Sequence, residues 1–222
     1  MIMGVKIAPS IAAGDQGRLA EEAAHLKEWG ADWIHVDIMD GMFAPNLTFG
    51  PSIVKAIRKA SDLPLDCHLM ISNPEILLEK FLQAGGDIMT IHAETVNAEA
   101  LSRIEKKIQE YNAKLGVAFK PATSLDSLDL SKIRISLVTI MTVNPGFSGQ
   151  KFMPEVLPKL EKANRLFPDR TKTEIEVDGG VDQTNAKSIS QKGASVLVAG
   201  NAVFGQKDPM VALNDLKKLV AS

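Results

Sequence analysis

The sequence predicts an α/β protein in which eight parallel strands and their helices form a single (β/α)8 TIM barrel over residues 1–222. Short apolar strands alternate with amphipathic helices along the whole chain, at intervals of roughly 20–40 residues. No linker or low-complexity segment divides this series, and 222 residues suit one core better than two. An open, doubly wound sheet is the alternative, but the segment SIAAG after the first strand lacks the GxGxxG fingerprint expected there.

Each expected strand is a short apolar run that ends at a turn or at a polar residue. The second one, for example, alternates apolar Ile34, Val36 and Ile38 with polar residues and stops before an Asp-Gly turn. Buried strands of this length are typical of a parallel sheet covered by helices. The strands are expected at residues 5–10, 33–39, 65–70, 87–92, 115–119, 136–143, 174–178 and 195–199.

Helical spacing of apolar residues identifies the segments between the strands, and glycine or proline marks their ends. Gly30 follows the first helix, Pro51 opens the second, and Pro74 opens the third. The helices are expected at residues 16–29, 51–60, 74–84, 98–111, 154–166, 183–192 and 209–220. A short, weak helix is expected around residues 125–130, and a helical turn at residues 200–204.

The composition excludes several classes of protein. A net charge of −2 and a pI near 6.1 give no electrostatic reason to bind nucleic acid or a membrane surface. Cys67 is the only cysteine, which excludes an internal disulfide and fits a reducing compartment. No stretch approaches the ~18 apolar residues of a membrane helix, and the N-terminus lacks a cleavage signal. We therefore expect a cytoplasmic protein.

Polar residues gather at the ends of neighbouring strands, where barrel enzymes place their active sites. Three of the four histidines, His35, His68 and His92, lie near the ends of the second, third and fourth strands. Strand alternation puts Asp37 on the face of His35, and Asp178 ends the seventh strand. His35, Asp37, His68 and Asp178 form a ligand set for one divalent transition metal, zinc first and Fe²⁺, Mn²⁺ or Co²⁺ as alternatives. A purely structural polar cluster is the other interpretation.

The other half of the predicted rim is rich in glycine. Loops at residues 144–150, 179–180 and 200–202 follow the sixth, seventh and eighth strands. Backbone N–H groups in such turns bind anions, and barrels often hold phosphate after their last strands. Each loop alone could be a simple turn, but three on adjacent strands predict a phosphate site. The expected phosphate-binding residues are Gly146, Phe147, Ser148, Gly149, Gly179, Gly180, Gly200 and Asn201.

Several motifs are specific in combination: Ser10, HVDIMDG at 35–41, PN at 45–46, HLM at 68–70, MTVNPGF at 141–147, GQ at 149–150 and EVDGG at 176–180. Together they resemble the ribulose-phosphate 3-epimerases, a family of pentulose-phosphate epimerases, from about residue 6 to residue 204. The resemblance implies that D-ribulose 5-phosphate and D-xylulose 5-phosphate are interconverted. It also implies that the four-residue set holds the metal and that Asp37 and Asp178 are the acid and the base.

The chemistry of epimerisation agrees with this resemblance. A proton next to a carbonyl leaves one face and another returns to the opposite face, through an enediolate whose oxyanion needs an electrophile. Glu176, on the strand face of Asp178, is either a partner behind the ligands or part of a buried ion pair. Substrate contacts are expected from Ser10, His68 and His92, and from Met39, Met70 and Met141, although irregular packing also explains methionine.

Three residues depart from the family pattern and weaken the substrate assignment. Met42 replaces a histidine, Ala93 a larger residue and Asn201 a small hydroxyl residue. The segment HAETVN at 92–97 also resembles hexulose-phosphate epimerases such as D-allulose 6-phosphate 3-epimerase, which remain the alternative, although the glycine pair at 179–180 favours the pentulose enzyme. A Schiff-base aldolase using Lys120 and a non-catalytic phosphosugar-binding module are further alternatives. We expect a phosphosugar substrate, no nucleic-acid or membrane partner, and a homo-oligomer.

Overall fold

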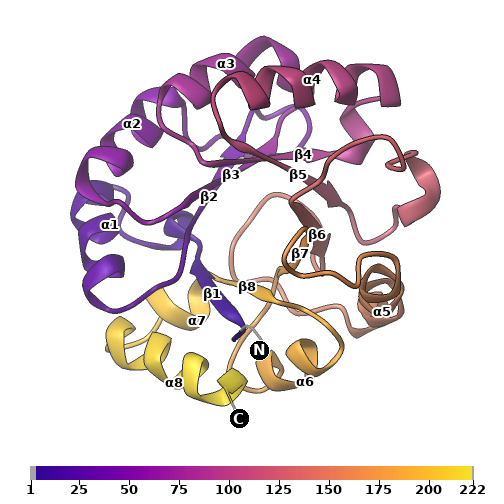
Figure 1. The fold of residues 1–222 in the computed structure, drawn as a ribbon. Coiled ribbons are helices and arrows are strands. Elements are labelled where there is room, and N and C mark those ends of the chain that lie inside the picture. Colours follow the sequence, from indigo (N-terminus) through magenta and orange to yellow (C-terminus); the bar gives the residue numbers. More distant parts are fainter. Residues whose placement is uncertain (1–3, 222) are drawn as a thin grey trace.

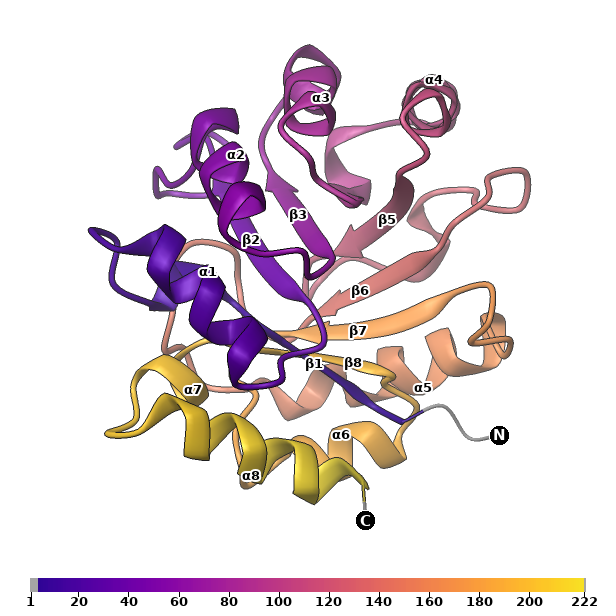
Figure 2. The same ribbon diagram turned by 60° about the vertical axis from the view of Figure 1, so that its left-hand side comes forward.

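The computed structural model describes residues 4–221 and shows eight parallel strands rolled into a nearly closed barrel, with the helices on the outside (Figure 1). The same arrangement is visible in the turned view of Figure 2. The strands are β1 Lys6–Pro9, β2 Ile34–Met39, β3 Leu65–Met70, β4 Ile88–His92, β5 Lys114–Phe119, β6 Leu137–Met141, β7 Glu174–Asp178 and β8 Val196–Ala199. Each expected strand is present, with ends that differ by at most two residues. The predicted (β/α)8 fold is confirmed.

The barrel closes between β1 and β2, which are the two ends of the continuous hydrogen-bonded ladder. At this seam Ser10 and His35 form an isolated parallel bridge. Further down, the Asp32 N–H donates to the Ile7 carbonyl (3.1 Å), and the Ile7 N–H donates to the Asp32 carboxylate (2.8 Å). The seam therefore brings Ser10, from the first strand end, directly beside the second strand.

The helices alternate with the strands as expected. They are α1 Leu19–Glu28, α2 Pro51–Ala60, α3 Pro74–Gln83, α4 Ala98–Glu110, α5 Leu157–Leu166, α6 Ala186–Gln191, α7 Asn201–Phe204 and α8 Pro209–Ala221. Short 3₁₀ turns occupy Ile11–Ala13, Ala93–Thr95, Leu125–Ser127 and Pro154–Val156. Among the described residues, no helix combines the length and the apolar character that a bilayer crossing requires.

Four expected helices have α-helical parts at least three residues shorter than predicted, and polar side chains account for two of these differences. The first begins at Leu19 rather than at residue 16, because the Asp15 carboxylate accepts the Gly17 N–H (2.9 Å) and holds a turn there. The sixth begins at Ala186 rather than at residue 183, because Asp182 holds Thr184 in the same way (2.7 Å). The helix expected at 154–166 begins with the 3₁₀ turn Pro154–Val156, and α5 starts at Leu157. The expected helix at 125–130 was wrong beyond a single 3₁₀ turn, since the chain is already extended at residue 128.

The core has two apolar parts. Outward strand residues pack against the helices in one large cluster, and a small inward cluster consists of Ala8, Trp33, Ile88, Leu137, Val196 and Val198. The inward-facing residues that lie next to this small cluster along the strands are polar. His35, Asp66, Thr90, Thr139 and Glu176 are completely buried there. Because buried polar groups are costly unless they are paired, this polar layer points to a functional purpose for the barrel interior.

Candidate active site

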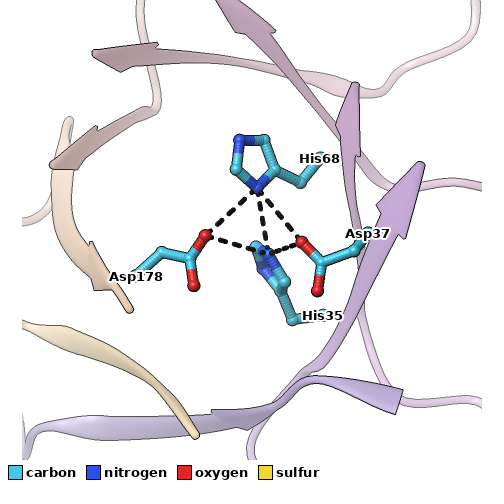
Figure 3. A group of neighbouring side chains, drawn as sticks. All are labelled: His35, Asp37, His68 and Asp178. Atoms are coloured by element: carbon cyan, nitrogen blue, oxygen red, sulfur yellow. Dashed lines mark hydrogen bonds and ion pairs between the residues drawn. The ribbon is translucent and has the colours of Figure 1, made fainter. Parts of the chain in front are cut away.

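Two imidazoles and two carboxylates converge at the carboxyl ends of β2, β3 and β7 (Figure 3). His35 Nε2 lies 3.2 Å from His68 Nδ1 and 3.3 Å from Asp37 Oδ1. His68 Nδ1 lies 3.3 Å from Asp178 Oδ2. Four ligands placed tetrahedrally at about 2.05 Å from a zinc ion would be separated by about 3.3 Å, so these atoms are spaced as the donors of one metal ion. The four predicted ligands are thus brought together, and the cluster could hold a metal.

Strand register sets this convergence. Asp37 lies beside His68 in the β2–β3 ladder, and Asp178 lies beside Met141 in the β6–β7 ladder. The bridge at the seam puts Ser10 next to His35, and Ser10 Oγ donates to Asp37 Oδ2 at 2.5 Å. One carboxylate oxygen of Asp37 therefore faces the imidazoles, while the other is held by the Ser10 hydroxyl.

Charge interactions within the cluster are strong. Burial by itself raises the pKa of Asp37, but His35 and His68 hold it well below its ordinary value. Burial lowers the pKa of His68, yet hydrogen bonds to Asp178 and Asp37 raise it to about 9. Without a cation, protons on the imidazoles therefore balance the two carboxylates. A divalent metal would replace those protons as the positive charge between them.

A second group of polar side chains lies behind His35. Asp66 Oδ2 is 2.8 Å from His35 Nδ1, and Thr90 Oγ1 donates to Asp66 Oδ1 at 2.6 Å. Thr139 Oγ1 donates to Glu176 Oε1 (2.9 Å), but Glu176 Oε2 has no hydrogen-bond partner and lies 3.8 Å from His35 Nδ1. Burial, together with the charge of Asp66, raises the pKa of Glu176 well above its ordinary value. Asp66 is therefore the hydrogen-bond partner of His35, and Glu176, expected behind the ligands or in a buried ion pair, lies beside this pair without a hydrogen bond to either imidazole.

A cavity of about 390 Å³ opens above the cluster. Asp37 and Asp178 line it and are each 9% exposed, whereas His35 and His68 are fully buried behind them. Most of the predicted substrate and phosphate residues line the same cavity. They are Ser10, Met39, Met70, Met141, Gly146, Phe147, Ser148, Gly149, Gly179, Gly180, Gly200 and Asn201. The structure thus joins the two halves of the predicted rim in one space.

The methionines form one apolar wall of the cavity. Met70 and Met141 pack with Ala44, and Met39 and Phe43 pack against them. His92 occupies a different place, because it is fully buried, does not line the cavity, and has Phe43 packed on its ring at a centroid distance of 4.5 Å. Burial lowers the pKa of His92 to about 4, so its imidazole is neutral. Direct contact between His92 and a substrate remains a prediction.

Some cavity residues had no signal in the sequence pattern. Gln16 lines the cavity from the turn before α1. Thr48 also lines it, donates to the Asp37 carbonyl (2.6 Å) and accepts the Met39 N–H (2.9 Å), which ties the loop after β2 to its own strand. Both residues lie in irregular segments, where periodicity carries no information. Asp66, by contrast, could have been assigned to His35 from strand alternation, since it shares a face with His68.

The fold and the site define a class. This is a (β/α)8 barrel with two partly exposed carboxylates and a candidate metal cluster at the carboxyl ends of its strands, where enzymes of this fold place their active sites. A model of the ribulose-phosphate 3-epimerase family matches residues 6–204. The chain is 43% identical to the ribulose-phosphate 3-epimerase of Bacillus subtilis (strain 168), over 96% of this chain and 98% of that one. It is 45% identical to the Synechocystis enzyme of the same name, over 92% and 89% of the two chains.

The chain therefore belongs to the ribulose-phosphate 3-epimerase family and is an epimerase of carbohydrate metabolism. Solved structures agree on the fold. KGPDC from Streptococcus mutans has a TM-score of 0.73 at 15% identity, over 98% of this chain and 97% of that one. A 3-hexulose-6-phosphate synthase has a TM-score of 0.60 at 20% identity, over 97% of this chain and 100% of that one. At these identities the likeness concerns the barrel alone.

Proposed function

We propose that the enzyme interconverts D-ribulose 5-phosphate and D-xylulose 5-phosphate by inverting C3 with two aspartates. The observation that carries the proposal is the placement of Asp37 and Asp178. They enter one cavity from β2 and β7, on opposite sides of the imidazole pair (Figure 3), and both keep a small exposed surface toward it. Inversion needs one acid–base group on each face of the reacting carbon, and this pair supplies the two groups.

The proton balance is simple. One aspartate, as the carboxylate, takes the C3 proton, and the electron pair moves into an enediolate across C2 and C3. The other aspartate, as the carboxylic acid, returns a proton to the opposite face of C3. After one turnover the two aspartates have exchanged protonation states, so proton exchange with solvent must restore them before the same direction runs again.

The enediolate oxygens carry the charge that must be stabilised. A divalent transition metal bound by His35, Asp37, His68 and Asp178 would supply that positive charge, with zinc as the first candidate and Fe²⁺, Mn²⁺ or Co²⁺ as alternatives. Ser10 keeps the second oxygen of Asp37 in place through its hydroxyl. Because the carboxylate is fixed, little reorganisation is needed as the proton moves.

The rest of the cavity suits a phosphosugar. The wall of Met39, Met70 and Met141 limits water at the reacting carbon. The loops after β6, β7 and β8 supply glycine backbone N–H groups for the phosphate, within the same cavity. Binding energy from this remote phosphate would position C3 between the two aspartates.

The test is an assay of ribulose 5-phosphate against allulose 6-phosphate, with metal analysis of the same preparation. We expect higher kcat/KM on the pentulose phosphate and about one metal ion per chain. Exhaustive chelation should abolish turnover, and a divalent transition metal should restore it. A preference for the hexulose phosphate would favour the alternative substrate, and full activity in a metal-free preparation would refute the four-ligand site.

A further inference from the structure

A chain of hydrogen bonds runs from His68 away from the cavity. His68 Nε2 lies 2.9 Å from His92 Nε2, and His92 Nδ1 lies 2.8 Å from Glu94 Oε2. The rings of His68 and His92 are nearly parallel, with centroids 5.0 Å apart. The other oxygen of Glu94, Oε1, accepts the backbone N–H of Lys120 at 2.8 Å. None of these contacts is explained by proton transfer to a substrate.

Counting protons assigns a tautomer to each imidazole in this series of hydrogen bonds. If His68 Nδ1 is a metal ligand, it carries no proton, so the neutral ring carries its proton on Nε2. That N–H must donate to His92 Nε2, which therefore carries no proton. The proton of His92 then sits on Nδ1 and is donated to the Glu94 carboxylate. Each donor in the chain meets one acceptor, and no position conflicts.

We propose that Glu94 and His92 are positioning residues that hold His68 in the tautomer with a free Nδ1, and so set the affinity of the cluster for its metal. This inference rests on the proposed metal site. Groups behind a metal-bound imidazole commonly fix its tautomer and orientation, and their loss costs about 10–100-fold in metal affinity. Here the stabilising carboxylate acts through a second imidazole rather than directly.

The two metal-facing imidazoles need opposite tautomers, and the structure gives each its own partner. His35 points Nε2 at the cluster, and Asp66 accepts from its Nδ1 at 2.8 Å. His68 points Nδ1 at the cluster, so its partner must act on Nε2, on the far side of the ring. Asp66 lies against His35 and Thr90, whereas His68 Nε2 faces His92 instead. His92 is therefore the hydrogen-bond partner of His68 Nε2.

The surroundings bury His92 completely and leave Glu94, the outer end of the hydrogen-bond chain, partly exposed. His92 has no exposed surface, Phe43 packs on its ring, and the Lys120 ammonium lies 3.6 Å from the centroid of Phe43. Glu94 is held at both oxygens, by the Lys120 N–H and by His92. Solvent therefore has no direct route to His92 Nε2, whereas the Glu94 carboxylate lies at the surface and keeps its place through these two hydrogen bonds.

The sharpest variant is Glu94→Gln, which keeps the shape and removes one acceptor. The amide keeps one of the two acceptor oxygens that serve Lys120, Thr123 and His92, so when that oxygen keeps the Lys120 N–H, the NH₂ group faces His92 Nδ1. His92 must then carry its proton on Nε2, and His68 is forced to place its own proton on Nδ1, the ligand atom. We expect Glu94→Gln to weaken metal binding about 10–100-fold, measured by chelator competition on the holoenzyme with zinc. Glu99→Gln, at an exposed position of α4, is the matched control and should bind zinc as the wild type does.

Two further measurements keep the test decisive. In His92→Phe the ring volume stays but the acceptor is lost, so zinc affinity should again fall about 10–100-fold. In the zinc-loaded wild type, ¹⁵N NMR should show His68 protonated at Nε2 and His92 protonated at Nδ1, a readout that a merely structural role would not fix. A proton on His92 Nε2, or unchanged zinc affinity in both variants, would overturn the inference and leave the proposed function standing. A wild type that binds no zinc or other divalent metal would overturn both.

Discussion

Gly180→Ala tests whether the turn after β7 shapes the part of the cavity that is expected to bind the phosphate. Gly180 has a φ of +63°, and an added Cβ would lie 2.4 Å from the Phe152 backbone nitrogen and 2.7 Å from Phe152 Cα. It would also lie 3.0 Å from the Gln150 carbonyl oxygen. These are backbone atoms that cannot rotate away, so residues 150–152 must shift. Gly149 is the matched control, because its φ is +78° but nothing lies within 4 Å of its Cβ position.

Comparing the two variants separates the cost of a left-handed backbone conformation from the cost of the steric clash at Gly180. A left-handed conformation costs an alanine about 1–2 kcal/mol, and this term applies to both. Forcing extra volume into a packed region adds about 1–3 kcal/mol, and this term applies to Gly180 alone. Gly180→Ala should therefore lose about 2–5 kcal/mol of stability and Gly149→Ala about 1–2 kcal/mol. At about 2–4 °C per kcal/mol for a chain of this size, Tm should fall by about 4–20 °C and about 2–8 °C respectively.

Thermal unfolding at fixed metal and phosphate concentrations measures this difference, because ligands shift Tm by mass action. Activity adds a second readout. Gln150 lines the cavity and its side chain holds the loop after β6 through the carbonyls of Asn144 and Phe147. The displaced segment in Gly180→Ala should therefore raise KM for the phosphosugar more than Gly149→Ala does. Equal losses of Tm in the two variants would show that the collision is relieved elsewhere and that the reasoning is wrong.

Three further predictions concern the chemistry. Asp37→Asn and Asp178→Asn should each fold and lose at least ~10²-fold in kcat, while C3 proton exchange with deuterated solvent survives for one epimer only; near-normal epimerisation with metal bound would contradict the two-aspartate mechanism. The kcat/KM for unphosphorylated ribulose should be far below that for ribulose 5-phosphate. Comparable rates on the two sugars would show that the glycine loops form turns but do not bind the phosphate. Because the carboxylates raise the pKa of His68 to about 9, its charged form stabilises the metal-free protein at low pH, and this stability is lost as the pH rises through about 9. Metal must displace that proton, so metal affinity should increase toward pH 9, and a flat dependence in chelator competition would refute this coupling.

Local patterns in the sequence determined the fold and the identity of the cluster. Strand alternation put Asp37 on the same face as His35, because successive side chains point to opposite faces of a strand. Eight strand–helix units without a linker predicted the barrel, and the barrel predicted which strand ends meet. The helix ends at Asp15 and Asp182 were misjudged, since carboxylate-capped turns compete with helical spacing over a few residues.

Only the tertiary structure decided which atoms meet. The sequence contains no information on whether an imidazole offers Nδ1 or Nε2, because that depends on ring rotation and on what lies behind the ring. The sequence did not indicate that His92 lies between His68 and Glu94 with Phe43 packed on its ring, and its expected contact with a substrate stays a prediction. These contacts join three separate strand ends and their loops. The register between strands and the packing of loops over them fix such distances, and no local periodicity encodes either.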